Sequence, residues 1–529
     1  MEDDAAGVTP YPRLYDCPTM GRDIFYVASS IPYVNAEPHV GTAYEIIACD
    51  LIARYRRMRD EEVYFLTGTD EHSHNVAKSA EEQGITPQEW TDRMVPKWRE
   101  VWERLLISND DFIRTSEPRH AERVQRFVQR LHDRGEVVLG SYEGPYCPSC
   151  EEFKTESELI DGNCPVHGIR VQRLEEDNYF FPLSKYQEPL LRLYEEHPEF
   201  IQPEIRRNEI VSFVKGGLQD LSISRSGSDW GIPVPWDPTH VIYVWVDALL
   251  NYITAPGFGD DEPFFDQVWP CDLHVIGKDI TRFHAVIWPA LLMAAGLDVP
   301  RIVFGHGFLT VGGEKMSKSL GTGIHPFELL DHFGVDSYRY FFMREIQFGA
   351  DGNFSWESMT DRHNADLANG LGNLASRVLA MLGSYYAGQV PEPGRAAGGN
   401  IPALVPEVVR RLDEHMDAVA LTSAVATIWE LVDAANKYLV TTEPWALAKD
   451  ADRRDELGAV LYSAAETLRI LAVLISPVMP EAAAKLWSQL GLDATPLSAQ
   501  RLPAAAQWGA LPPGTQTSRG SSLFPRLEN

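Results

Sequence analysis

Apolar positions along the first third of the chain alternate between short runs and helical stripes. Residues 24–28 form an apolar run typical of a strand, and apolar side chains then recur at helical spacing from Ile46 to Tyr55. The run 63–67 predicts a second buried strand. A strand, a helix and a strand in this order predict a βαβ unit, and therefore an α/β protein with a parallel sheet.

This alternation is interrupted from about Gly140 to Pro235 by a segment rich in turns, charge and cysteine. Strand patterns resume at 241–245, 273–276 and 301–304. The simplest interpretation is one Rossmann-like, nucleotide-binding sheet whose chain is split by an inserted domain.

Beyond about Gly352 the pattern is helical, with apolar stripes over 365–385, 405–439, 456–475 and 480–490. The apolar run 470–475 is short and follows Arg469, so it fits a core helix and not a membrane span.

Charge narrows the class of protein. The 529 residues include 47 Lys and Arg against 76 Asp and Glu, a net charge of −29, which excludes a general nucleic-acid coat protein. From residue 366 to the end, 17 acids face 13 bases, so most of the excess acid lies earlier in the chain. A selective partner of RNA remains compatible with this distribution. The acidic first 21 residues lack the features of a signal peptide, and we expect a cytoplasmic protein.

Three of the six cysteines lie in one short segment that also contains a histidine. Cys147 and Cys150 form one C-x-x-C pair, and Cys164 and His167 form a C-x-x-H pair after residues 151–163. Each pair can present two ligands to one tetrahedral Zn²⁺, and four protein ligands make a structural site. A disulfide framework is the weaker alternative in a reducing compartment.

The segment 38–42 (PHVGT) lies between the first strand and the first helix. In an open α/β sheet, ligands bind at the carboxyl ends of strands, and a helix amino terminus suits phosphate. Gly41 permits close approach to the backbone, while His39 and Thr42 supply donors. An ordinary capped helix with Thr42 as the N-cap is the alternative.

The segment 315–319 (KMSKS) follows a strand pattern and two glycines. Two lysines and two serines on a loop can neutralise a triphosphate as pyrophosphate departs. Alone, the segment could be a basic surface loop. Together, the two segments resemble the paired signatures of class I aminoacyl-tRNA synthetases.

Four further segments resemble methionyl-tRNA synthetases: 26–39 (YVASSIPYVNAEPH), 65–72 (FLTGTDEH), 243–248 (YVWVDA) and 274–284 (HVIGKDITRFH). The resemblance runs from about residue 22 nearly to the end. It implies methionine activation with ATP and Mg²⁺, transfer to tRNA(Met), a zinc knuckle with Cys₃His ligation and a monomer.

The resemblance also implies roles for individual residues. The catalytic residues would be His39, Thr42, Lys315 and Lys318, and the ATP-binding residues His39, Gly41, Thr42, Gly277, Asp279, Lys315, Ser317 and Lys318. The methionine pocket would comprise Ile31, Tyr33, Asp70, Trp245, Ala248, Tyr252, Phe283 and His284. Asn373, Arg377 and Trp445 would read the anticodon, and Cys147, Cys150, Cys164 and His167 would bind Zn²⁺.

The expected domains follow from the same resemblance. They are an acidic tail (1–21), a Rossmann-like catalytic domain (22–125 and 236–325), an inserted connective domain with the zinc knuckle (126–235), a stem-contact region (326–365) and a helical anticodon-binding domain (366–529).

Two positions depart from the family pattern. The first signature often ends in His where Thr42 stands, and threonine cannot carry positive charge. Leu249 stands where proline is frequent, which alters one wall of the pocket.

Two alternatives remain at this stage. One is a class I relative that charges another amino acid, although relatives for isoleucine, valine and leucine carry larger editing insertions. Discrimination by one methylene contributes only about 1–3 kcal/mol, which explains that editing. The other is a paralog without catalytic activity, against which Asp70 and the intact 315–319 segment argue.

Overall fold

The computed structural model describes residues 24–147, 152–154, 156–165, 168–226, 228–311, 314–315, 324–394 and 398–528. The chain divides into two compact units, one comprising Asp23–Cys49 and Val63–Phe308, the other including Asp50–Glu62 and Leu309–Asn529. We call them the catalytic unit and the helical unit. The predicted tail 1–21 lies outside the described residues.

The catalytic unit is built on a six-stranded sheet in the order β3-β2-β1-β12-β13-β7. β1 pairs in parallel with β12, β12 with β13, β13 with β7, and β2 with β3. The strands are β1 (Ile24–Ser29), β2 (Glu62–Thr69), β3 (Asp111–Arg114), β7 (Ile201–Gln202), β12 (Leu273–Gly277) and β13 (Ile302–His306). The parallel, Rossmann-like sheet is therefore confirmed.

Helices cover this sheet and bury its apolar side chains. The predicted first helix is confirmed as α1 (Val40–Met58), whose residues from Asp50 onward belong to the helical unit. Its apolar side chains Ile46, Ile47, Leu51, Ile52 and Tyr55 are all buried. The other helices of the unit are α2 (His74–Glu82), α3 (Pro87–Arg104), α4 (Pro118–Asp133), α5 (Gln187–Glu196), α6 (Glu204–Lys215), α7 (Val244–Leu249), α8 (Asn251–Thr254), α9 (Glu262–Val268) and α10 (Trp288–Ala295).

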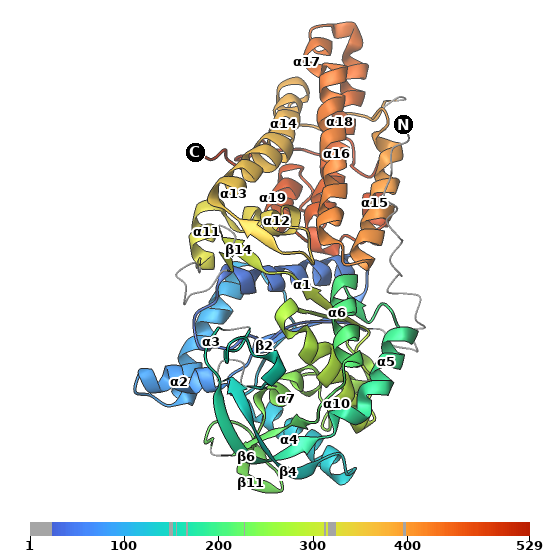
Figure 1. Ribbon diagram of the computed structural model, residues 1–529. Helices are drawn as coiled ribbons and strands as arrows, with labels where there is room; N and C mark the ends of the chain where they lie inside the picture. The colour runs from blue at the N-terminus through green and yellow to red at the C-terminus, as the bar shows by residue number, and fades with distance from the viewer. Residues whose placement is uncertain are drawn as a thin grey trace, which may run out of the picture. The chain divides into compact units, whose positions relative to one another are not determined.

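The predicted insertion and the residues just after it form antiparallel sheets, a topology that the sequence pattern did not indicate. One contains β5 (Glu152–Phe153), β4 (Val138–Cys147), β6 (Gln172–Phe181) and β8 (Leu221–Ser222), and the other β10 (Pro233–Val234), β11 (Asp237–Ile242) and β9 (Ser224–Ser226). Figure 1 shows the long β4–β6 hairpin in green beside β11. The insertion also supplies β7 to the parallel sheet, which the sequence did not indicate.

The predicted strand at 241–245 is only partly correct. β11 ends at Ile242, and the amides of Val246 and Asp247 bond to the Tyr243 carbonyl to begin α7. Val244 and the residues from Val246 to Leu249 are all buried. A short, wholly buried apolar run has no polar face, so its periodicity does not distinguish a strand from a helix.

The helical unit begins with a small sheet of β15 (Glu314–Lys315), β14 (Leu309–Val311) and β16 (Gly352–Phe354). Its helical segments are α11 (Pro326–Phe333), α12 (Val335–Arg344), α13 (Trp356–Arg362), the π-helical η6 (His363–Gly372), α14 (Asn373–Tyr386), α15 (Ile401–Asp417), α16 (Leu421–Thr442), α17 (Pro444–Leu447), α18 (Arg454–Ile475) and α19 (Pro480–Gln489). α16 packs against α15 and α18, and α14 packs against α18 (Figure 1).

The predicted helical block 405–439 is two helices. α15 ends at Asp417, Val419 has a φ of 55°, and α16 begins at Leu421. A turn this short leaves the apolar periodicity of both helices intact, so the pattern does not reveal it.

α18 forms the core of the helical unit. The stretch Ala451–Ile475 is long and apolar enough to cross a membrane by composition, but 94% of its most apolar window is buried inside the protein. This burial matches the core helix expected around 470–475.

Candidate active site

The order of strands places a switch point between β1 and β12. From this point the chain continues to β2 and β3 on one side and to β13 on the other. In sheets of this kind, ligands bind at the carboxyl ends of the strands beside the switch point. Ser29 ends β1 and Gly277 ends β12, so the 38–42 segment and Asp279 follow two neighbouring strand ends.

The first signature caps α1 with its own side chains. The Gly41 amide donates to Nδ1 of His39 over 3.0 Å, and the Thr42 hydroxyl donates to the His39 carbonyl over 2.9 Å. Because Nδ1 accepts, a neutral His39 ring carries its proton on Nε2. A Cβ at Gly41 would lie 2.9 Å from Cε1 of His39, so this ring position requires glycine. Thr42 is the third residue of α1, which begins at Val40, so it is not the N-cap that the alternative interpretation predicts.

Glu45 of α1 and His306 form a buried ion pair close to this segment, which the sequence did not predict. Glu45 accepts from the amide and the hydroxyl of Ser30, over 2.7 and 2.6 Å, and its other oxygen lies 2.9 Å from Nε2 of His306. His306 ends β13, and its Nδ1 lies 2.7 Å from the Gly307 carbonyl. Glu45 lies one helical turn beyond Gly41 and therefore on the same face of α1. This spacing is the only local signal in the sequence that could have identified Glu45 as part of the site.

Gly277 ends β12, and Asp279 lies two residues beyond it. A Cβ at Gly277 would lie 2.7 Å from Oδ1 of Asp279, so glycine lets that carboxylate fold back over the strand end. Asp279 is exposed at this edge, where a hydroxylated ligand could approach it.

The predicted methionine pocket contains one buried carboxylate. Asp70 follows β2 and is 2% exposed. Its amide donates to the Pro32 carbonyl over 2.9 Å, and an isolated bridge pairs it with Tyr33. These backbone bonds bring Asp70 beside the loop after β1, as the resemblance implies. A buried carboxylate suits a substrate ammonium group.

Aromatic rings form the rest of the predicted pocket. Trp245 and Phe283 stack with centroids 3.8 Å apart and an interplanar angle of 11°, and the Tyr33 ring centroid lies 6.3 Å from that of Trp245. Ala248 is buried in α7, and Ile31 packs against the apolar core that includes Phe283. Polarizable rings favour a thioether, with roughly 0.3–1.5 kcal/mol for each sulfur–ring contact.

Tyr252 and His284 add a polar contact to this aromatic group. The Tyr252 hydroxyl lies 2.8 Å from Nε2 of His284, and both residues are buried. Burial lowers the pKa of His284 to about 4, so its imidazole is neutral at pH 7.

The second signature is described only in part. The backbone of Lys315 ends β15 and pairs with Thr310, whereas Ser317 and Lys318 lie outside the described residues.

Comparison with known proteins identifies the family. The model for class I tRNA synthetases (M) matches residues 25–176 and 170–379, and the model for the anticodon binding domain of methionyl tRNA ligase matches residues 390–529. This chain belongs to the class I tRNA synthetases of the methionyl type. It is 49% identical to a methionine–tRNA ligase of Streptomyces coelicolor, with 96% of this chain and 97% of the relative covered.

Other members of the family are similarly close. A methionine–tRNA ligase of Caldanaerobacter subterraneus is 47% identical over 96% of this chain and 79% of its own. The Mycobacterium tuberculosis methionyl-tRNA synthetase in complex with methionyl-adenylate aligns with a TM-score of 0.90 at 45% identity, covering 95% of this chain and 100% of that one. Its apo form aligns at 0.85 and 43% identity, covering 96% and 99%.

The methionyl-type helical unit brings two of the three predicted anticodon residues into contact. The Arg377 guanidinium lies 5.6 Å from the ring centroid of Trp445, which is 38% exposed at α17. Asn373 is exposed one turn before Arg377 on α14. An exposed indole beside an arginine can stack an unpaired base.

Two of the four predicted zinc ligands of this synthetase are described. Cys147 ends β4 and Cys164 opens a tight turn in which the Gly168 amide donates to the Cys164 carbonyl over 2.8 Å. Both residues are fully buried. Cys150 and His167 lie outside the described residues, and within the described ranges no group of three or more His, Cys, Asp or Glu could hold a metal.

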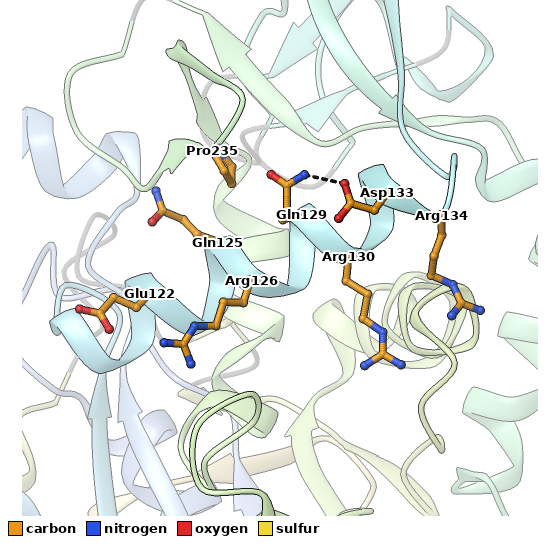
Figure 2. Close-up of a pocket in the computed structure, with 8 residues that line it drawn as sticks. All are labelled: Glu122, Gln125, Arg126, Gln129, Arg130, Asp133, Arg134 and Pro235. Atoms are coloured by element: carbon orange, nitrogen blue, oxygen red, sulfur yellow. Dashed lines mark hydrogen bonds between the residues drawn. The ribbon is translucent and has the colours of Figure 1, made fainter.

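A surface pocket of about 690 Å³ lies elsewhere on the catalytic unit of this synthetase. It is lined by α4 and Pro235, and Figure 2 shows Arg126, Arg130 and Arg134 projecting from one face of that helix. None of the predicted site residues lines it. Arg126 donates to the Gly259 carbonyl, so one of these three arginines holds the loop between α8 and α9 in place.

Proposed function

We propose that this chain is a methionine–tRNA ligase, which forms methionyl-adenylate from methionine and ATP and transfers the methionyl group to tRNA(Met). The observation that carries the proposal is the juxtaposition of the buried Asp70 carboxylate with Tyr33 and, beyond it, the stacked rings of Trp245 and Phe283. The names of the relatives and of the adenylate-bound structure support the same substrate.

In the proposed first step, Asp70 binds the ammonium group and the aromatic rings hold the thioether. An oxygen of the methionine carboxylate attacks the α-phosphorus of ATP, and the bond from that phosphorus to the bridging oxygen breaks to release pyrophosphate. Positioning and charge neutralisation carry such a step, with little covalent help from the protein.

The proposed ATP site lies at the switch point. His39, Gly41 and Thr42 would lie along the phosphates, Gly277 and Asp279 along the nucleoside, and Lys315, Ser317 and Lys318 against the departing pyrophosphate. Mg²⁺ bound with ATP would neutralise phosphate charge. In the second step, a ribose hydroxyl at the 3′ end of tRNA attacks the methionyl carbonyl carbon, and AMP leaves.

ATP–pyrophosphate exchange across amino acids tests this function. We expect exchange with methionine and not with isoleucine, leucine or valine. Exchange only with another amino acid would contradict the substrate, and no exchange with any amino acid would contradict the enzyme. The variant K318A should slow adenylate formation by orders of magnitude with methionine binding largely intact, and a normal rate would disprove the role of Lys318.

We also propose a structural Zn²⁺ held by Cys147, Cys150, Cys164 and His167. The buried sulfur of Cys164 within a tight turn fits a C-x-x-H ligand pair. Metal analysis of the purified protein should find one zinc per chain, and chelation should expose residues 140–170 to protease. A metal-free protein with normal activity would contradict this site.

The domain division, the monomeric state and the cytoplasmic location given by the sequence belong to the same proposal. Light scattering of the purified chain tests the monomer, because a mass twice that of the 59.4 kDa chain would contradict it.

A further inference from the structure

The carboxylate of Asp247 joins two histidines inside the catalytic unit. Oδ2 of Asp247 lies 2.7 Å from Nδ1 of His72, and Oδ1 lies 2.7 Å from Nε2 of His120. Asp247 and His120 are fully buried, and the His72 side chain is 8% exposed. Each carboxylate oxygen thus has a charged or polar partner, as a buried carboxylate requires.

The two histidines come from separate parts of the fold. His72 lies in the loop between β2 and α2, and His120 lies in the first turn of α4. Nδ1 of His120 lies 2.7 Å from the Thr254 hydroxyl in α8. Asp247 itself belongs to α7, so one carboxylate ties together a loop and three helices.

This network borders both halves of the proposed methionine pocket. Asp247 lies between Trp245 and Ala248 in sequence, and His72 lies two residues after Asp70. Fixing the His72 ring against Asp247 therefore fixes the loop that carries the ammonium-binding carboxylate against the helix that carries the apolar wall.

The residue between Asp70 and His72 is held just as firmly. Arg114 binds Glu71 through Nε and Nη2, at 2.8 and 2.9 Å from its two carboxylate oxygens. The indole of Trp230 donates to the Glu71 carbonyl over 2.6 Å, and its ring lies edge-on to His72 with centroids 5.0 Å apart.

The electrostatics keep the carboxylate charged. Burial alone would raise the pKa of Asp247, but the charge and hydrogen bonds of His72 and His120 outweigh it and hold that pKa below its usual value. Hydrogen bonds to a charged group are stronger and more directional than neutral ones, which suits a group that sets a distance.

We infer that Asp247 is a positioning residue of the methionine site: through His72 it sets the spacing between Asp70 and the wall formed by Trp245 and Ala248. This inference rests on the proposed function, and it goes beyond it by assigning methionine affinity to three residues that need not touch the substrate.

The test compares steady-state ATP–pyrophosphate exchange in D247N with that of the wild-type enzyme. The amide keeps the shape of the carboxylate but removes its charge and replaces one acceptor oxygen by a donor, so the charge-assisted hydrogen bond to one histidine is lost. We expect the KM for methionine to rise by roughly tenfold to a hundredfold, the range for loss of a hydrogen bond to a charged group. The KM for ATP and the kcat at saturating methionine should change little.

A matched control separates positioning from simple destabilisation. Asp272 is a buried carboxylate of the same unit, bonded to the Tyr26 amide over 2.8 Å and to Arg301 over 3.2 Å, and it precedes the amino end of β12, away from the switch point. The variant D272N should lower the melting temperature and leave the KM for methionine unchanged.

Conservative variants of His72 provide a second test. The amide nitrogen of asparagine can take the place of Nδ1, so H72N should keep a KM near that of the wild type, whereas H72L should raise it like D247N. An unchanged KM for methionine in both D247N and H72L would overturn the inference. Failure of the wild-type enzyme to exchange with methionine would instead overturn the proposed function.

Discussion

The hydroxyl of Tyr252 lies 2.8 Å from Nε2 of His284, while Nδ1 of the same imidazole lies 3.1 Å from the Ile280 carbonyl. A carbonyl can only accept, so Nδ1 carries the proton and Nε2 accepts from Tyr252. The Tyr252 hydroxyl therefore donates its hydrogen bond to His284, and this bond holds the ring of Tyr252 in one orientation.

Replacing Tyr252 by phenylalanine should remove this orientation and leave Nε2 of a buried histidine without its donor. We expect the free energy of unfolding of the catalytic unit to fall by about 1–3 kcal/mol, the usual effect of an unsatisfied buried polar group, and the KM for methionine to rise. Denaturant unfolding and pyrophosphate exchange measure the two effects. Tyr194, whose hydroxyl donates to the Ala285 carbonyl over 2.6 Å, offers the control, because Y194F should reduce stability alone.

His284 also predicts a pH dependence of stability. Burial lowers its pKa to about 4 in the folded protein, against about 6.5 in the unfolded chain. Between these values the unfolded state binds more protons, so stability is complete above pH 6.5 and falls as the pH drops toward 4. The loss attributable to this group is about 3 kcal/mol.

Unfolding of the wild type and of H284Q across this range measures that contribution. The wild type should lose more stability than the variant between pH 6.5 and 4. The pKa of His274 is also lowered, first by burial and then by repulsion from His284. The stability of H284Q should therefore still depend on pH, but less steeply than that of the wild type. Parallel profiles for the two proteins would contradict the assignment to His284.

His306 should behave in the opposite way. Burial disfavours its charged form, but the hydrogen bond and the charge of Glu45 outweigh burial and raise the pKa of His306. The stabilisation by this pair is therefore complete below the unfolded pKa and is lost as the pH rises through the higher folded pKa.

The variant E45Q should remove that pH dependence and weaken the ATP site. Because glutamine carries no charge, we expect the free energy of unfolding of E45Q to be lower than that of the wild type by about 1–3 kcal/mol at pH 6. This gap between the two proteins should narrow at higher pH. The KM for ATP should rise because Glu45 also fixes Ser30 at the end of β1. A gap that does not change with pH would contradict the ion pair between Glu45 and His306.

The sequence predicts the parallel sheet and much of the pocket because both depend on local features. The runs 24–28 and 63–67 predict their strands from local pattern alone, and the resemblance carries Asp70, Trp245 and His284 as parts of recognisable segments. The contact between Glu45 and His306 joins residues 261 positions apart, and no spacing rule connects them. The same holds for His72, Asp247 and His120, since each lies in a different element and their contact arises only when the sheet and its helices pack.

The anticodon contact offers the last prediction, because it separates the two steps of the reaction. Trp445 is exposed beside Arg377, and stacking of a base on an aromatic ring contributes roughly 1–3 kcal/mol. W445A should therefore lower the kcat/KM for tRNA aminoacylation by about tenfold to a hundredfold while leaving pyrophosphate exchange unchanged. An equal loss of pyrophosphate exchange in W445A would assign the effect to stability of the chain and not to the base contact.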